Sequence, residues 1–166
     1  MRTVAELGGW AWYEFAGFLR QGNKEALHVP STSFDEPTLT GLLAQTAFVV
    51  AFHGASDSGD PVVHVGGRWK VGRRKLIDAI NGVSKEDGIT AEDATLQGLD
   101  ESNITNRGLL KEGVQLEFSR GARNMLFPPD ASREARGRRS TQLRLLASAI
   151  HEAIDQLTRI AAEQPR

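Results

Sequence analysis

The stretch GVQLEFSRGAR, residues 113–123, contains the pattern on which the fold assignment depends most. Its first part, GVQLEFS, has the composition of a buried strand, yet it carries Glu117, and Arg107 and Arg123 lie on either side of it. A carboxylate inside an apolar strand is costly unless it is paired or bound to something. Glu117 is therefore either half of a structural ion pair with one of these arginines or part of a functional site.

Outward from this strand, the chain alternates between helical and strand patterns. The helices are expected at residues 4–21, 37–46, 73–83 and 141–163, and the strands at 26–32, 47–54, 61–67 and 114–119. Strand 47–54 is apolar at nearly every position, which is typical of a strand covered on both faces. The alternation predicts an α/β fold, a sheet with helices on both faces.

The chain has 166 residues, which suits a single domain over residues 1–166. Within it, residues 127–140 are rich in Pro, Arg and Ser and predict a flexible loop before the C-terminal helix at 141–163. That helix is the clearest of all, because its apolar residues recur at three- and four-residue spacing on one face.

Composition excludes several classes of partner and site. The net charge is -1, so we expect no nucleic-acid partner. The chain has no cysteine, which excludes disulfides and thiolate metal sites. The longest apolar run, AFVVAF, is too short to span a membrane, and the N-terminus lacks the pattern of a signal peptide. We therefore expect a cytoplasmic location and no membrane partner.

Two expected strands end in polar residues, and ligands of open α/β sheets bind beyond the carboxyl ends of strands. AFVVAF is followed by His53, and VQL is followed by Glu117. Taken alone, His53 is more typical of a histidine satisfied at the edge of a core. His28 and His64 lie in strand-like segments and are read as ordinary edge or surface residues.

Four motifs occur in a fixed order: STSFDEP (31–37), AFHG (51–54), NITNRG (103–108) and GVQLEFSRGAR (113–123). Together they resemble the poly-γ-glutamate hydrolase family of phages and bacilli, some members of which carry the label phage-related replication protein. The resemblance covers the chain from its first helix to about Phe127. It implies a fold similar to the zinc carboxypeptidases, with a mixed sheet and one Zn²⁺ at the strand ends.

The family pattern has a further motif that this sequence lacks. Members of the family open with a strand and a stretch like HGGxIExGT, which supplies a zinc-binding His and Glu. This sequence opens with MRTVAELGG, which matches the family just after that motif. His53, at the later HG position, is thus the one expected zinc ligand with a counterpart. We expect that the coding start lies upstream, because losing the strand exposes a sheet edge; the alternative is a protein that has lost its metal.

The resemblance also implies roles for individual residues. Glu117, at the QLE position, is the expected general base for a metal-activated water. Arg107 and Arg123 are expected to bind carboxylates of poly-γ-glutamate or of a related acidic amide. Asn103 and Asn106 are the expected polar neighbours of the substrate.

Asp35 and Glu36 allow two interpretations. By the resemblance they support the site, and by local pattern they cap the following helix, where acidic residues suit the helix dipole.

Three functions follow. The first is a zinc-dependent hydrolase of γ-glutamyl amide bonds, inactive as written if two ligands are missing. The second is a catalytically dead relative that binds an anionic polymer or a protein. The third is a phage replication accessory protein, which the composition supports least, because the sequence has no basic stripe with interleaved aromatic residues.

Overall fold

The computed structural model describes residues 2–16, 18–22, 26–55, 59–94, 97–127 and 133–164, and for residues 133–140 the backbone alone. The helices are α1 (Arg2–Gly8), α3 (Pro37–Leu43), α4 (Lys70–Ser84), α5 (Arg120–Leu126) and α6 (Arg133–Glu163), with a short 3₁₀ helix η1 (Ile104–Asn106). The strands are β1 (Val49–Gly54), β2 (Val62–Gly66), β3 (Thr90–Asp93) and β4 (Gly113–Phe118). Helices and strands are thus interspersed along the described chain, as expected for an α/β fold.

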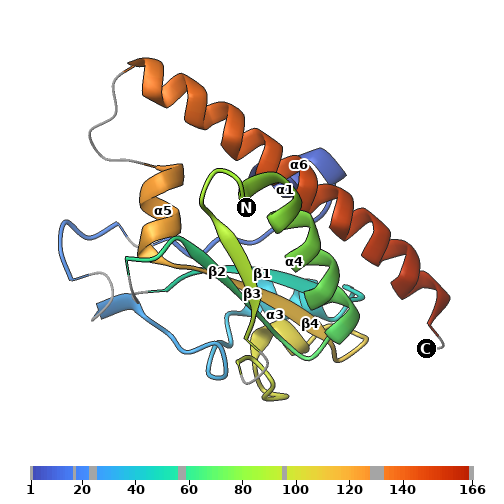
Figure 1. Ribbon diagram of the computed structural model, residues 1–166. Coiled ribbons are helices and arrows are strands. Elements are labelled where there is room, and N and C mark those ends of the chain that lie inside the picture. The colour runs from blue at the N-terminus through green and yellow to red at the C-terminus, as the bar shows by residue number, and fades with distance from the viewer. Residues whose placement is uncertain are drawn as a thin grey trace.

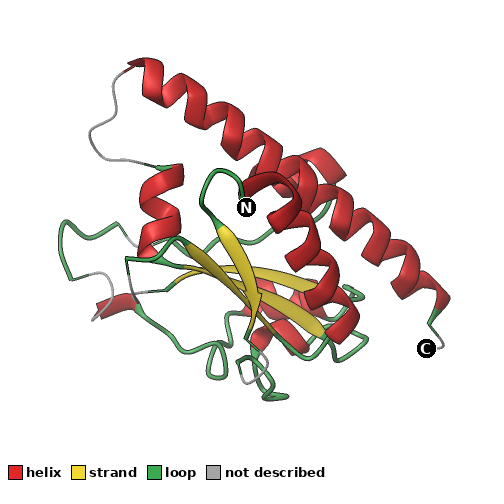
Figure 2. Ribbon diagram, in the orientation of Figure 1, coloured by secondary structure: helices red, strands yellow, loops and turns green. Residues whose placement is uncertain are grey.

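The four strands form one mixed sheet in the order β1-β4-β2-β3 (Figure 2). β1 runs parallel to β4, β4 antiparallel to β2, and β2 parallel to β3. β4 is thus an internal strand, and the carboxyl ends of β1 and β4 meet at the same end of the sheet. This confirms the expected α/β fold with a mixed sheet.

One face of the sheet carries the apolar core. Val63, Val65, Val114 and Leu116 point to this face and are fully buried. They pack in one cluster with residues of α4 and α6, such as Leu76 and Leu157. Figure 1 shows α4 and α6 lying over this face. We call it the helix face.

The other face is covered differently. Because side chains alternate along a strand, Gln115 and Glu117 point away from the helix face. Here η1 lies against β1 and β4, and Asn103, just before η1, donates a hydrogen bond to Gln115. Figure 1 places the short α3 on this side of the sheet. We call it the loop face.

Strand β1 differs from its prediction. It pairs with β4 and is at the edge of the described sheet, and none of its residues is fully buried. The expectation that both faces of this strand are covered is therefore wrong for the described residues. Its apolar run reflects partial cover: Phe52 packs against the core from the helix face, and η1 lies near it on the loop face.

Three further predictions need correction. The helix expected at 4–21 ends at Gly8, because Gly9 takes a left-handed backbone (φ 63°) that turns the chain. No strand forms at 26–32; Ser33 instead donates to the carbonyl of Pro30 in a turn. The loop predicted at 127–140 is helical from Arg133, where α6 begins, and residues 128–132 lie outside the described residues.

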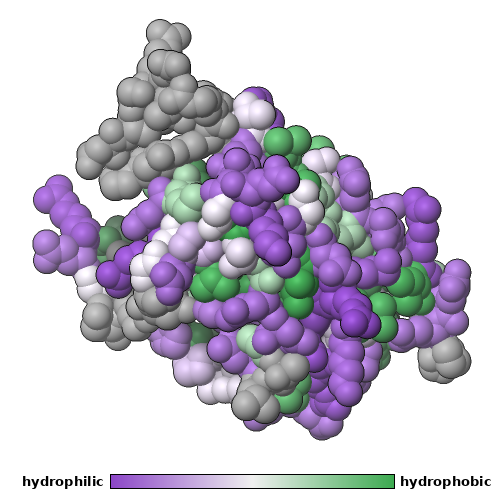
Figure 3. Space-filling view, in the orientation of Figure 1, coloured by the Kyte–Doolittle hydropathy of each residue, from purple (hydrophilic) through white to green (hydrophobic). Residues whose placement is uncertain are grey.

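The surface of the molecule in the orientation of Figure 1 is mostly hydrophilic, with scattered apolar patches (Figure 3). Within the part of the chain that the structure describes, no helix combines the length and the apolar character needed to cross a membrane.

Candidate functional site

A row of polar side chains crosses the loop face of the sheet. His53 on β1 pairs in register with Glu117 on β4, and Glu117 pairs in register with His64 on β2. His64 in turn pairs with Glu92 on β3, and its Nδ1 lies 2.8 Å from the Glu92 carboxylate. Residues paired in register point to the same face with their Cβ atoms about 5 Å apart. The two residues predicted from the strand ends, His53 and Glu117, are therefore direct neighbours.

Glu117 is half-buried in this row. Among the residues that the structure describes, it forms no ion pair with Arg107 or Arg123, because both guanidinium groups bond to backbone carbonyls instead. The structural ion pair suggested by the sequence pattern is thus absent from the described residues. Within the described residues, Glu117 is therefore a half-buried carboxylate without an arginine partner, which favours a role in binding or chemistry.

Arg123 reaches the same end of the sheet from the other side. Ser119 caps α5 at its N-terminus, and Arg123 lies one turn further on. Its guanidinium crosses to β1, where Nη2 donates to the carbonyl of Ala55 at 2.6 Å. It passes over Gly54, where an added Cβ would lie 2.8 Å from Nη1. Arg123 is exposed, so it presents a cation at the strand ends, next to Gly54.

The segments that cover the loop face, η1 and α3 with their loops, are called the loop layer. Arg107 belongs to this layer and connects two of the motifs. Its Nη1 donates to the carbonyl of Phe34 at 2.7 Å, and the backbone N–H of Ile104 donates to Ser31 at 2.8 Å. NITNRG is thereby held against STSFDEP. Arg107 is half-buried, and its bond to Phe34 holds the guanidinium at that loop, without an ion pair to Glu117 among the described residues.

Asn103 and Asn106 brace this loop. Asn103 caps η1 by accepting from the backbone N–H of Thr105 at 3.0 Å, and Asn106 donates to the carbonyls of Gly98 and Asp100. They are 6% and 1% exposed, so the structure places both inside the loop layer. Their expected contact with substrate stays a prediction, because in this conformation their bonds are internal.

Glu36 caps α3, as the local pattern suggested. Its carboxylate accepts hydrogen bonds from the backbone N–H groups of Thr38 and Leu39 at 3.1 and 2.9 Å. These bonds, that from Leu39 most of all, lower the pKa of Glu36. Desolvation, and then the charge of Glu36, raise the pKa of Tyr13. Asp35 is exposed beside this cap. The supporting role expected of the pair stays a prediction.

His53 has one feature of a metal ligand. Its Nε2 is buried and has no hydrogen-bond partner in the described structure. Zinc hydrolases use three protein ligands, however, and within the described ranges no three His, Asp or Glu side chains come close enough to hold a metal. The described residues thus supply one candidate ligand and do not fit a complete zinc site.

Sequence reasoning misses Glu92, because it predicts no strand at β3. It also treats His64 as an ordinary edge residue, since the place of His64 beside Glu117 depends on β4 lying between β1 and β2. Strand order of this kind has no local sequence signal. A period-two pattern in ITAED, with Ile89 and Ala91 buried, was the one available hint for β3.

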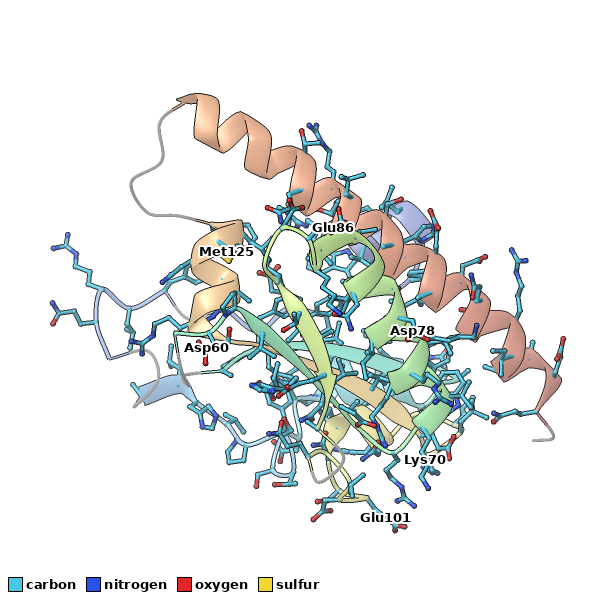
Figure 4. All side chains as sticks on the ribbon, viewed as in Figure 1. Asp60, Lys70, Asp78, Glu86, Glu101 and Met125 are labelled. Carbon is cyan, nitrogen blue, oxygen red and sulfur yellow. The ribbon has the colours of Figure 1, made fainter. Side chains whose placement is uncertain are left out.

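An open depression lies at the opposite end of the sheet. Its lining residues are Arg68, Lys70, Arg73, Leu99, Glu101 and Glu112. Figure 4 places Lys70 and Glu101 at this end and Asp60 at the end where β4 finishes. Two of its arginines are already paired, Arg68 with Glu101 and Arg73 with Asp93. We therefore place the candidate site at His53 and Glu117.

Comparison with known proteins gives sequence relatives. In Bacillus subtilis (strain 168), the UPF0714 protein YmaC is 30% identical over 128 residues, which cover 75% of this chain and 54% of that protein. The SPbeta prophage-derived UPF0714 protein YoqZ is 31% identical over 115 residues, which cover 69% and 41%. The chain thus spans about half the length of the curated relatives it matches.

Two solved structures share the fold. One is described as "Structure of Bacteriophage poly-gamma-glutamate hydrolase", with a TM-score of 0.81 and 35% identity, covering 96% of this chain and 76% of that one. The other is "YNDL-apo (Zinc-free)", with a TM-score of 0.67 and 25% identity, covering 87% and 75%. A family model described as poly-gamma-glutamate hydrolase matches residues 1–152. With its four ordered motifs and this fold, the chain belongs to the poly-gamma-glutamate hydrolase family.

Proposed function

We propose that this protein hydrolyses γ-glutamyl amide bonds in poly-γ-glutamate or a closely related acidic amide. The observation that carries the proposal is the register of β1 and β4, which sets His53 beside Glu117 at the strand ends. The cation of Arg123 at the same end and the family membership support it.

In the proposed reaction, Glu117 carries the proton. Its carboxylate takes a proton from the attacking water as the new C–O bond forms at the amide carbonyl carbon. It then returns the proton to the amide nitrogen as the C–N bond breaks, so that a carboxylic acid and an amine leave. Glu117 suits this role because it is half-buried and has no counter-charge among the arginines described above.

In the proposal, arginine binds the negatively charged carboxylates of the substrate. Every unit of poly-γ-glutamate carries a free α-carboxylate, and a planar guanidinium binds carboxylates by paired hydrogen bonds. Arg123 is exposed, and its bond to Ala55 orients it at the strand ends. Arg107 has a different part in the proposal: it holds the NITNRG and STSFDEP loops together through Phe34, and it meets substrate only if that loop moves.

Zinc enters this proposal only as a requirement to be tested. His53 offers a buried, unpartnered Nε2, and the other ligands would have to come from outside the described residues. We therefore assign no step of the reaction to a metal ion.

The decisive experiment compares two glutamates at opposite ends of β4. The 166-residue protein is incubated with poly-γ-glutamate, with and without added zinc, and the release of new amino groups is measured. We expect cleavage by the unchanged protein, a loss of about 10²–10⁴-fold in Glu117→Gln, and little change in Glu112→Gln. An equal loss in both variants, or no effect of Glu117→Gln, would contradict the role of Glu117.

A second function is favoured by the exposed cation of Arg123 at the strand ends: a non-catalytic protein that binds an anionic polymer through this side chain. It predicts that the protein binds poly-γ-glutamate without cleaving it even when zinc is added, and that Arg123→Gln weakens this binding. If the protein neither binds nor cleaves poly-γ-glutamate, both functions are overturned.

A further inference from the structure

The polar row continues past the residues that the family motifs mark. Beyond Glu117, away from His53, lies His64 on β2, directly opposite Glu117 in the antiparallel ladder. His64 is outside all four motifs. Glu117 is thus flanked by a histidine on each side, His53 on β1 and His64 on β2.

His64 is itself held in place. Its Nδ1 lies 2.8 Å from Oε1 of Glu92, its neighbour on β3. The His64 side chain is 21% exposed and that of Glu92 is 62% exposed, so the pair closes the row on the solvent side.

We infer that His64, fixed by Glu92, is a positioning residue for Glu117. The inference rests on the proposed function, in which Glu117 moves the proton. Side chains directly opposite in an antiparallel pair are close enough to interact, and a carboxylate that must take and return a proton works best in one fixed orientation. A tethered imidazole beside it limits the orientations that the carboxylate can take. Glu92 acts one step further away, through His64.

A surface ion pair is the competing explanation for His64 and Glu92. Such pairs add little to stability, with a median of about 0–1 kcal/mol, and have no reason to act on the reaction. The two explanations differ in which step of the kinetics they change and in whether His64 senses Glu117.

The kinetic experiment uses His64→Gln, Glu92→Gln and the double variant on poly-γ-glutamate. Misplacing a reacting group by about 1 Å can cost about 10²-fold in rate. We expect kcat to fall by about 10-fold or more in His64→Gln, with KM within about 2-fold, and less in Glu92→Gln. The double variant should be no worse than His64→Gln, because Glu92 acts through His64. Additive losses, or an effect on KM alone, would overturn the inference.

A second measurement needs no activity. The ring nitrogen signals of the four histidines are assigned by NMR, and Glu117→Gln is introduced. We expect the His64 ring signals to move, as they should in Glu92→Gln. The control is Glu86→Gln, since Glu86 lies at the far end of α4, away from the row (Figure 4). Unchanged His64 signals in Glu117→Gln overturn the inference even if the enzyme is active. An inactive protein whose His64 still senses Glu117 would refute the proposed function but not this pairing.

Discussion

The two faces of the sheet are built from the same four strands and serve opposite needs. On the helix face, Val65 and Leu116 pair in register and are fully buried under α4 and α6. One residue further along β4, on the loop face, Glu117 pairs with His64 and His53. Neighbouring positions on one strand therefore belong to different environments.

The two faces show how a small domain keeps its stabilising core apart from its candidate site. Burial of apolar area, worth roughly 25 cal/mol per Å², is concentrated on the helix face. The loop face is held by hydrogen bonds such as those of Asn103 and Asn106. Residues on the loop face can therefore be reactive without reducing the stability that the core on the helix face provides.

The largest expected effect is on the free energy of unfolding, and it differs between two adjacent residues that point to opposite faces. Leu116→Ala should lower the free energy of unfolding by about 2–5 kcal/mol, because it leaves a cavity in a fully buried position. Glu117→Gln should change it by less than about 1 kcal/mol, since no ion pair with the arginines is lost. Urea unfolding of both variants measures this. A similar cost for both would mean that Glu117 is a structural residue.

An intermediate effect is expected where the two faces join, at Ser119. Its buried hydroxyl accepts from the backbone N–H groups of Val62 and Ala122, each at 3.0 Å, and donates to the carbonyl of Asp60 at 2.6 Å. Ser119→Ala leaves these groups unpaired and should lower the free energy of unfolding by about 1–3 kcal/mol.

The matched control is Ser102→Ala, because the exposed Ser102 hydroxyl bonds to Asp100 and its loss should cost less than about 0.5 kcal/mol. Thermal or urea unfolding of the two variants would show whether the link between β2 and α5 depends on this hydroxyl. Equal, small changes in both would refute that role.

The smallest effect concerns the loop layer and depends on pH. The α3 cap lowers the pKa of Glu36 in the folded protein. The ionised carboxylate therefore stabilises the fold above the unfolded pKa of about 4.3, and this contribution is lost as the pH falls through the lower, folded value. We expect the urea midpoint of Glu36→Gln to lie below that of the unchanged protein at pH 7, with the gap closing as the pH falls below 4.

Asp35→Asn serves as the control, because it removes the neighbouring exposed carboxylate and leaves the cap intact. A gap between Glu36→Gln and the unchanged protein that stays constant from pH 7 to pH 3 would show that the cap does not depend on the charge.

Strongly patterned segments could be predicted from the sequence, and weakly patterned ones could not. β4 and most of α6 were predicted because apolar residues recur there at the period of a strand or a helix. β3 was missed, since TAED buries a single residue, Ala91. α5 was missed although its signal is present: Ser119 caps it, and Ala122 and Leu126 lie four apart on one buried face.

The candidate site follows the same rule. His53 and Glu117 could be predicted because both end apolar strands, and parallel strand ends meet. The flanking pair of His64 and Glu92 could not, because its position depends on β2 lying antiparallel beside β4. Arg107 was expected beside the substrate on the resemblance, whereas its observed partner, the carbonyl of Phe34, belongs to a distant loop.

Because Gly54 has no side chain, the AFHG motif and the arginine of GVQLEFSRGAR constrain each other in evolution. An alanine Cβ at position 54 would lie 2.8 Å from Nη1 of Arg123 and would displace the guanidinium, which is the mobile end of a flexible side chain. Such a change would be nearly silent in stability, and its effect would appear at position 123. In a lineage that replaced Arg123 by a short side chain, position 54 would become free to vary. A residue other than glycine at position 54, directly after His53, is therefore expected only where position 123 no longer carries arginine.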